Sequence, residues 1–570
     1  MSAEDKTFYP PVIPDIEDWP IYRLSEDRKN FVEEVDQFTV NRLLKIHGNK
    51  IGDTIAKTIY QERIRIKEEP WKVDPPNERL FWKRIRRKLL KSGLDKGEEE
   101  VRKTNEEILR QIVHRYSEEI VGAFRIKPFL FARRFLTLFF TRLLNTAAGR
   151  NWGRIFGSKY SLMDRLIVTG YIEEVRSLMK KGVVIVAPTH FSNLDSILIG
   201  YAMDTFMGLP SFSYGAGLNL YNTGYTAYFM NRLGAYRVDR RKKNVVYLET
   251  LKAMSNLSIQ RGVNSLFFPG GTRSRSGALE TRLKLGLLGT VVEAQRALFE
   301  QGKDTKVFVV PLVLGYHFVL EAKFLIEQHL RETGQERYIR SQDESGSPWQ
   351  ILKFIWQLFS KANEITLSFG RPMDVLGNPV DAEGRSMDAR GRELDIKGFF
   401  MLDGVVNRDL QRESEYTKMV AEKIVDRYFR DNTVLTSHLV AYAAFEILKQ
   451  QNMRLDIYGV LRLPEDDYVF PKDVLYDVVD QLKAGLTEME SRGEIRLSPE
   501  IGLNIEELVA DGISRLGNFH VGKPLRFNKK DEIVSDSFKV LYYYHNRLEN
   551  YGLNKKIRWR KMEEVPEPAE

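Results

Sequence analysis

Residues 183–195 have the sequence VVIVAPTHFSNLD. The first five residues are apolar and mostly β-branched, which predicts a short buried strand. Pro188 ends the strand because proline has no N–H to give to a neighbouring strand. Residues 194–203 then show the apolar pattern of a helix. A strand, a polar loop and a helix therefore follow one another, and the loop carries a histidine.

The same alternation continues along the chain. Short apolar runs predict further strands at 235–238, 265–268, 307–314 and 365–369, with helices at 244–260 and 283–300 between them. Strands that alternate with helices are typical of an α/β layered fold. In such folds the ligand-binding loops lie at strand ends.

The 570 residues are enough for two or three domains. We expect a helical N-terminal region at 1–150, an α/β catalytic domain at 151–375, a charged loop or linker at 376–414 and a helical C-terminal domain at 415–560. The beginning of the chain, MSAEDKTFYPP, has no apolar stretch typical of a secretory signal, so we expect none.

Composition restricts the chemistry. The chain has no cysteine, which excludes disulfides, thiolate metal sites and a cysteine nucleophile. Its net charge of +9, from 87 basic and 78 acidic residues, is a mild bias. That bias is compatible with an ordinary mixed surface, anionic lipid, nucleic acid or a phosphorylated substrate.

Residues 129–144, FLFARRFLTLFFTRLL, are strongly apolar but contain Arg133, Arg134 and Arg142. A bilayer-spanning helix needs about 20 apolar residues, so this stretch predicts either a helix in the membrane interface or a core helix with arginines reaching the surface. A second, basic amphipathic candidate is WKRIRRKLLK at 82–91. Residues 205–231 are uncharged and rich in Phe, Tyr and Gly, which suits an apolar wall for a lipid chain or ordinary core.

His190 and Asp195 are the first candidate catalytic residues. His190 lies in the loop after the strand, and Asp195 follows five residues later at the start of the helix. An aspartate that accepts a hydrogen bond from one imidazole nitrogen fixes the tautomer and makes the other nitrogen a better base. Such a pair suits removal of a proton from an external hydroxyl. A structural histidine is the alternative.

A second candidate is the stretch FFPGGTRSRSG at 267–277. Gly270 and Gly271 let the backbone approach a ligand closely, while Arg273 and Arg275 suit phosphate oxygens. Lys284 follows and adds a point charge. The spacing is not that of a P-loop, and an arginine-rich surface turn is the alternative.

Two more stretches complete the pattern. Residues 233–241, LGAYRVDRR, indicate a strand that ends in Arg240 and Arg241, and a solvated basic turn is the alternative. Residues 310–316, VPLVLGY, indicate a buried strand with a proline inside it. Because proline removes a donor from the sheet, Pro311 predicts an edge strand or a bulge.

These four elements fall in order within about 130 residues, and together they resemble the glycerolipid acyltransferase superfamily. Within it the chain is most similar to the long bacterial glycerol-3-phosphate acyltransferases and their dihydroxyacetone-phosphate relatives, through AGLNL at 216–220 and GYHFVLE at 315–321. The resemblance implies a central mixed sheet flanked by helices. One departure is Gly270, where the family has a glutamate associated with acceptor binding, and this puts the acceptor in question.

The resemblance also implies roles for individual residues. His190 would take the proton of an acceptor hydroxyl, oriented by Asp195. Arg273 and Arg275 would hold a phosphate, helped by Arg240, Arg241 and Lys284. The residues expected to shape the site are Asn219, Gly270, Gly271 and Pro311.

The implied reaction is transfer of a fatty acyl group from acyl-coenzyme A or acyl-carrier protein to the sn-1 hydroxyl of glycerol-3-phosphate, an early step of phospholipid synthesis. We expect the thioester to be a substrate, with no bound cofactor and no metal. We expect peripheral association with anionic lipid at the cytoplasmic face of the inner membrane, and no nucleic-acid partner. The alternatives are a lysophosphatidate acyltransferase, a catalytically inactive lipid-binding member of the superfamily and a nucleic-acid-binding protein.

Overall fold

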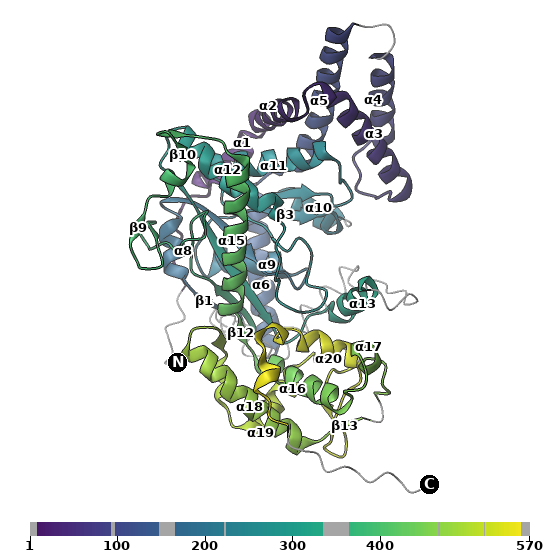
Figure 1. Cartoon of the computed structure of the whole chain (residues 1–570), viewed down its shortest axis with the longest axis vertical. Coiled ribbons are helices and arrows are strands. Elements are labelled where there is room, and N and C mark those ends of the chain that lie inside the picture. Colours follow the sequence, from purple (N-terminus) through teal and green to yellow (C-terminus); the bar gives the residue numbers. More distant parts are fainter. Residues whose placement is uncertain are drawn as a thin grey trace.

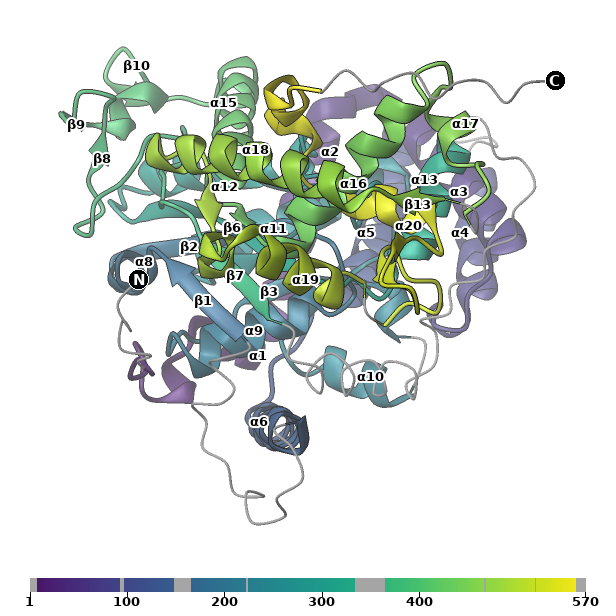
Figure 2. The same cartoon turned by 90° about the horizontal axis from the view of Figure 1, so that it is seen from below.

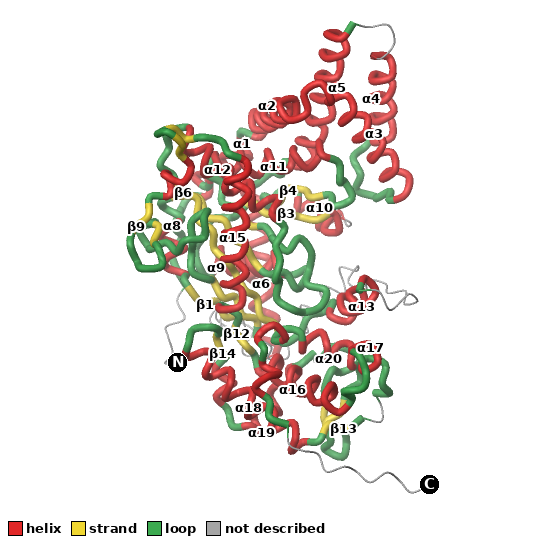
Figure 3. Tube along the Cα trace, viewed as in Figure 1, coloured by secondary structure: helices red, strands yellow, loops and turns green. Residues whose placement is uncertain are grey.

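The computed structural model describes residues 8–92, 97–147, 166–221, 224–333, 364–465, 468–517 and 519–559. Its strands gather in the middle of the molecule, with mainly helical regions at both ends (Figure 3). The N-terminal helices project at one end of the long axis, and the C-terminal helices form the other (Figure 1).

The central sheet has seven strands in the order β1-β7-β6-β2-β5-β3-β4. Every neighbouring pair is parallel except β6 and β7, so the sheet is mixed, as expected. The strands are β1 (Leu166–Gly170), β2 (Gly182–Pro188), β3 (Ser213–Gly217), β4 (Ala235–Val238), β5 (Ser265–Leu266), β6 (Lys306–Tyr316) and β7 (Ile365–Phe369). The sequence pattern predicted five of them, and it missed β1 and β3.

Pro311 does not lie in an edge strand, because β6 is interior between β7 and β2. Pro311 is paired with Ala187 of β2. It stands one residue outside the last β6–β7 pair, Leu312 with Phe369, and its carbonyl accepts from Gly370 N at 2.8 Å. An interior proline is tolerated at this point because β7 has already ended there.

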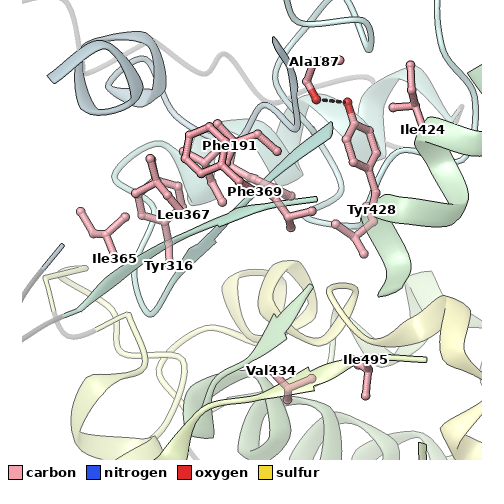
Figure 4. Close-up of a cluster of buried hydrophobic side chains, with 14 of the residues drawn as sticks. Ala187, Phe191, Tyr316, Ile365, Leu367, Phe369, Ile424, Tyr428, Val434 and Ile495 are labelled. Atoms are coloured by element: carbon pink, nitrogen blue, oxygen red, sulfur yellow. Dashed lines mark hydrogen bonds between the residues drawn. The ribbon is translucent and has the colours of Figure 1, made fainter. Parts of the chain in front are cut away.

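Helices flank the sheet. They are α8 (Ile172–Leu178), α9 (Asp195–Thr205), α10 (Gly224–Met230), α11 (Val245–Gln260), α12 (Leu285–Glu300), α13 (Ala322–Glu332) and α15 (Leu410–Arg430). The expected domain boundary at residue 415 falls inside α15, which packs against α12 and β6 and so belongs with the sheet. Its Tyr428 donates to the carbonyl of Ala187 at 3.0 Å, beside Ile424 (Figure 4).

The expected linker at 376–414 contains short strands. Two small antiparallel ribbons lie there, β8 (Ser386–Met387) with β9 (Glu393–Leu394) and β10 (Met401–Leu402) with β11 (Val405–Val406).

The N-terminal region is helical and packs on the α/β domain. Its helices are α1 (Pro20–Glu26), α2 (Arg28–His47), α3 (Ile51–Glu68), α4 (Glu78–Ser92), α5 (Glu98–Ile120) and α6 (Ile126–Ala147). Helices α2 and α5 share a hydrophobic core with α11. In α4, Trp82 and Ile85 are buried in that core. Part of the apolar face of the basic run at 82–91 is thus used inside the protein, while Leu90 is exposed.

Helix α6 lies at the edge of the molecule in the view of Figure 2. Its side chains are described as far as residue 138, so Arg142 lies outside them. Phe131, Phe135 and Leu138 are exposed on it. Across the described residues, every helix falls short of the length and hydropathy that a bilayer crossing requires.

The C-terminal domain follows α15. It consists of α16 (Thr436–Gln451), α17 (Ile457–Val460), α18 (Lys472–Ser491), α19 (Ile505–Arg515), α20 (Phe538–His545) and the short strands β12 (Thr433–Val434), β13 (Val469–Phe470), β14 (Arg496–Leu497), β15 (Arg526–Phe527) and β16 (Ile533–Val534). Helix α20 packs against α13, so this domain reaches the loops at the end of β6.

Candidate active site

The structure brings His190 and Asp195 together at the end of β2. His190 Nδ1 lies 2.7 Å from Asp195 Oδ2, and the Asp195 side chain is fully buried. The same carboxylate oxygen accepts from the backbone N–H groups of Phe191 at 2.7 Å and Ser192 at 3.0 Å. A carboxylate can only accept, so Nδ1 of His190 donates. Its Nε2 is therefore left as the acceptor nitrogen, as a general base requires.

Tyr316 completes the support of this dyad. Its hydroxyl, at the end of β6, donates to Asp195 Oδ1 at 2.5 Å. Burial raises the pKa of Tyr316 well above its ordinary range, and the Asp195 carboxylate raises it further, so the hydroxyl keeps its proton. Both oxygens of Asp195 are thus occupied. On another side the His190 ring stacks on Phe268, with centroids 4.0 Å apart.

The arginine loop after β5 is attached to the dyad through its backbone. Ser274 N donates to the carbonyl of His190 at 2.7 Å. Arg273 Nη1 lies 3.1 Å from Glu321 Oε1, and Glu321 also accepts from Asn193 N at 3.1 Å. Burial raises the pKa of Glu321, while the Arg273 guanidinium opposes this. Glu321 therefore holds Arg273 beside the loop that carries His190. The sequence analysis included Glu321 in the GYHFVLE motif but assigned it no role.

Arg240, Arg273 and Arg275 form a group of like charges. Loss of hydration lowers the pKa of Arg240, and the nearby Arg273 and Arg275 lower it further. Arg275 forms an ion pair with Glu332. Like charges gathered near one another repel, and an anion such as phosphate relieves that repulsion.

The two arginines of the 240–241 pair have different surroundings. Arg241 pairs with Asp239 at 2.8 Å and with Asp74 of the N-terminal region at 2.5 Å. These carboxylates raise the pKa of Arg241 above its already high ordinary value. The next residue, Lys242, pairs with Glu119 at 2.6 Å. Arg241 therefore attaches the turn to the N-terminal helices, and the structure does not bring it into the arginine group.

Gly270 and Gly271 form the turn beneath the arginine loop. Gly271 has a positive φ of 79°, which favours glycine. A Cβ on Gly271 would lie 2.5 Å from Cδ of Lys284, so the lysine chain covers this turn. Asn219 lies in the 3-10 turn Leu218–Tyr221, and its side chain lies outside the described ones.

Two candidate functional residues were not predicted from the sequence. Glu280 accepts from His190 N at 3.2 Å, and burial raises the pKa of its carboxyl to about 7. Arg547, from the C-terminal domain, is buried 4.4 Å above the Phe191 ring and donates to the carbonyl of Leu314 at 2.6 Å. The printed sequence carries no signal for Arg547, which lies more than 350 residues after His190.

An apolar cavity of about 130 Å³ lies along α9, the helix that begins with Asp195. Ser196 and Ile197, the residues directly after Asp195 in α9, help to line it. Its other walls come from α6, from the rest of α9 and from the uncharged stretch 205–231, and include Leu136, Tyr201, Phe212, Tyr214 and Met230. Arg133 of α6 pairs with Asp204 of α9 at 2.8 Å, which joins the two helices beside the cavity. Arg133 is thus engaged within the protein, whereas Arg134 is exposed.

No group of three histidine, aspartate or glutamate side chains that suits a metal ion occurs in the described part of the chain. What the site does hold is a buried histidine–aspartate dyad, a group of arginines and an apolar cavity, all at strand ends of a mixed α/β sheet. This arrangement suits a group-transfer reaction in which a histidine acts as the base.

Comparison with known proteins agrees with that class. Residues 168–315 match the family model described as Acyltransferase. Over 216 residues the chain is 27% identical to the glycerol-3-phosphate acyltransferase of Alteromonas mediterranea, covering 37% of this chain and 23% of the relative. Over 211 residues it is 29% identical to that of Aeromonas hydrophila, covering 36% of this chain and 23% of the relative. These similarities all lie in the α/β domain, and they support its assignment to the glycerolipid acyltransferase superfamily.

The match spans less than a quarter of the length of these relatives. Among solved structures, the 1-acyl-sn-glycerophosphate acyltransferase of Thermotoga maritima aligns at 14% identity with a TM-score of 0.24, covering 65% of this chain and 94% of that chain.

Proposed function

We propose that this chain transfers a fatty acyl group from a thioester, acyl-coenzyme A or acyl-carrier protein, to a hydroxyl of glycerol-3-phosphate. The observation that carries the proposal is the His190–Asp195 dyad, in which Nε2 of the imidazole is left as an acceptor. The proton acceptor and the anion-binding charges are thus held together through the backbone of the arginine loop.

In the proposed reaction, Nε2 of His190 takes the proton of the acceptor hydroxyl. The oxygen attacks the thioester carbonyl carbon, the carbon–sulfur bond breaks, and the leaving thiolate takes the proton back from His190. Asp195 stabilises the imidazolium in between. Arg273, Arg275 and Arg240 would bind the acceptor phosphate, and this anchoring turns an encounter between two molecules into a reaction within one complex. Lys284 is a further candidate for the phosphate.

The apolar cavity is the candidate site for the acyl chain, because its walls are mostly apolar and it opens beside the residues that follow Asp195. Helix α6 supplies both a wall of the cavity and the exposed side chains of Phe131, Phe135 and Leu138. A helix with this outer face suits docking at a membrane interface, where lipid donors and products partition. We propose peripheral association with anionic lipid through α6.

The test is acyl transfer by the purified chain in detergent. Radiolabelled glycerol-3-phosphate, dihydroxyacetone phosphate and lysophosphatidate are each offered with palmitoyl-coenzyme A and with palmitoyl-acyl-carrier protein. We expect transfer to glycerol-3-phosphate that His190→Ala abolishes, while His114→Ala, a change on the distant helix α5, leaves it intact. Transfer to lysophosphatidate alone would replace the acceptor, and transfer to none of the three by the folded protein would refute the proposal.

A further inference from the structure

The space in front of Gly270 is filled by a side chain from ten residues further along. A Cβ built on Gly270 would lie 3.0 Å from both Cγ and Oε1 of Glu280. Contacts this short are tighter than most real Cβ contacts, so a larger residue at 270 would require the Glu280 side chain to shift by a few tenths of an ångström. The Gly270–Gly271 turn is therefore the surface on which this carboxylate lies.

The two oxygens of Glu280 have different surroundings. Oε1 accepts from the backbone N–H of His190 at 3.2 Å. Oε2 is buried and has no hydrogen-bond partner among the residues that the structure describes. A buried carboxylate oxygen without a partner is costly, and a purely structural role in holding the His190 backbone needs only Oε1. Oε2 of Glu280 could thus accept a hydrogen bond from a bound ligand.

The position of Glu280 indicates where that donor would come from. Glu280 is bonded to the residue that carries the proposed base, and Asp195 and Arg547 are close enough to shift its protonation in opposite directions. The glycine turn beneath it leads into the arginine loop, whose Ser274 holds the other side of the His190 backbone. A polyol phosphate bound by those arginines would bring its hydroxyls to this corner.

We propose that Glu280 is an acceptor-binding residue: its Oε2 accepts a hydrogen bond from a second hydroxyl of the acceptor while His190 takes the proton of the first. This inference rests on the proposed function and deepens it, because it specifies the acceptor as a phosphorylated diol. Glycerol-3-phosphate has two neighbouring hydroxyls. In dihydroxyacetone phosphate a ketone replaces the second hydroxyl. A ketone oxygen can only accept a hydrogen bond, and so can the Glu280 carboxylate, so no hydrogen bond would form between them.

The consequence is a difference in selectivity. A site that hydrogen-bonds a substrate hydroxyl discriminates strongly against an analogue that lacks it. Glu280→Gln keeps the size of the side chain and the acceptor for His190 N–H, and it places an NH₂ donor where Oε2 was. The glutamine therefore suits the ketone better than the glutamate does.

The experiment measures kcat and KM of the full-length protein with both acceptors at pH 8, where the Glu280 carboxyl is ionised. For Glu280→Gln we expect the preference for glycerol-3-phosphate over dihydroxyacetone phosphate, as the ratio of kcat/KM values, to fall by about tenfold or more. Most of the change should be in KM. The matched control is Glu300→Gln, a glutamate at the far end of the following helix α12, which should leave the ratio unchanged.

A second variant reaches the same carboxylate without removing its charge. Gly270→Ala pushes a methyl group against Cγ and Oε1 of Glu280. It should raise the KM for glycerol-3-phosphate and reduce the ratio in the same direction. Because the two variants change the carboxylate in different ways, either variant can test the inference if the other folds poorly.

Three outcomes are distinct. If His190→Ala abolishes transfer but neither Glu280→Gln nor Gly270→Ala changes the acceptor ratio, the inference is wrong and the proposed function stands. If both variants lower kcat equally for the two acceptors, Glu280 is only a positioning residue for the His190 loop, and the inference again fails. If the wild-type protein transfers to no acceptor, the proposed function fails and the inference falls with it.

Discussion

Replacing Glu280 by glutamine is predicted to stabilise the protein at neutral and alkaline pH. Burial raises the pKa of this carboxyl from an ordinary 4.5 to about 7, against the opposing effect of the Arg547 guanidinium and with a small contribution from Asp195. In the unfolded chain the carboxyl loses its proton near its ordinary value. The folded protein therefore holds a proton between those two pH values that the unfolded chain has already released.

The sign of the effect follows from this proton. Stability falls as pH rises wherever the folded state binds more protons than the unfolded state. The cost is absent below the unfolded pKa, grows between about pH 4.5 and pH 7, and is complete above pH 7. Each tenfold change in a protonation equilibrium is worth about 1.4 kcal/mol, so the complete cost is about 3 kcal/mol.

Glutamine has the same shape and no charge, so Glu280→Gln removes this cost. We expect the variant to equal the wild type at pH 4.5 and to exceed it by up to about 3 kcal/mol at pH 8. A domain of 150–250 residues gains about 2–4 °C in Tm for each kcal/mol, so the difference in melting temperature should approach several degrees. The assay is thermal unfolding of both proteins, followed by tryptophan fluorescence at a series of pH values, with Glu300→Gln as the control.

The reasoning is refuted if Glu280→Gln melts at or below the wild-type temperature at pH 8. It is also refuted if the difference between the two proteins is the same at pH 4.5 and pH 8, because the effect would then not come from ionisation. Confirmation would mean that the same substitution increases stability and reduces acceptor selectivity, which is the expected behaviour of a residue kept for binding rather than for folding.

Three further predictions concern the neighbourhood of the site. Tyr316→Phe removes the donor to the dyad aspartate and leaves a buried carboxylate oxygen unpaired, so kcat should fall about tenfold with little change in KM, and steady-state kinetics beside His190→Ala measures this. Arg241→Ala should lower the free energy of unfolding by about 3 kcal/mol, because it breaks a largely buried ion pair, and it should leave the acceptor KM unchanged. Arg240→Ala should raise the acceptor KM without this loss of stability. Equal effects of the two variants on KM would show that the two arginines do not have different roles. Phe131→Ser with Phe135→Ser should weaken flotation with anionic liposomes, and undiminished binding would exclude this face of α6 as the docking surface.

The sequence pattern was sufficient for much of the α/β domain. The runs that form β2 and β6 are almost wholly apolar and rich in β-branched residues, so their burial follows from composition. Strand β3, SYGAG, has two glycines and little β propensity, and it is a strand because β4 and β5 pair with it. Strand β1 lies at the sheet edge and pairs only with β7. The tertiary pairing explains why β3 was missed, whereas β1 has the sequence LIVTG, a β-branched run that the local pattern could have predicted.

The dyad could be predicted because its two members are five residues apart in a strand–loop–helix unit. Arg241 could not be separated from Arg240, since adjacent basic residues are indistinguishable until Asp74 of a distant helical region is seen to pair with one of them. Tyr316 was visible within a motif, but its role depends on β6 lying next to β2. Each of these roles is set by the order of strands in the sheet, which local periodicity does not contain.

Gly270 illustrates the limit of motif comparison in physical terms. At that position the resemblance led us to expect a glutamate, and the glycine put acceptor binding in question. A binding site requires a carboxylate at a place in space, and the turn at Gly270 allows one to arrive from Glu280 because no Cβ blocks it. The absence of a motif side chain therefore indicates lost function only if no other residue places an equivalent group in the same volume. Here that volume contains a carboxylate bonded to His190 N, so the departure at residue 270 moves the candidate acceptor-binding group along the chain instead of removing it.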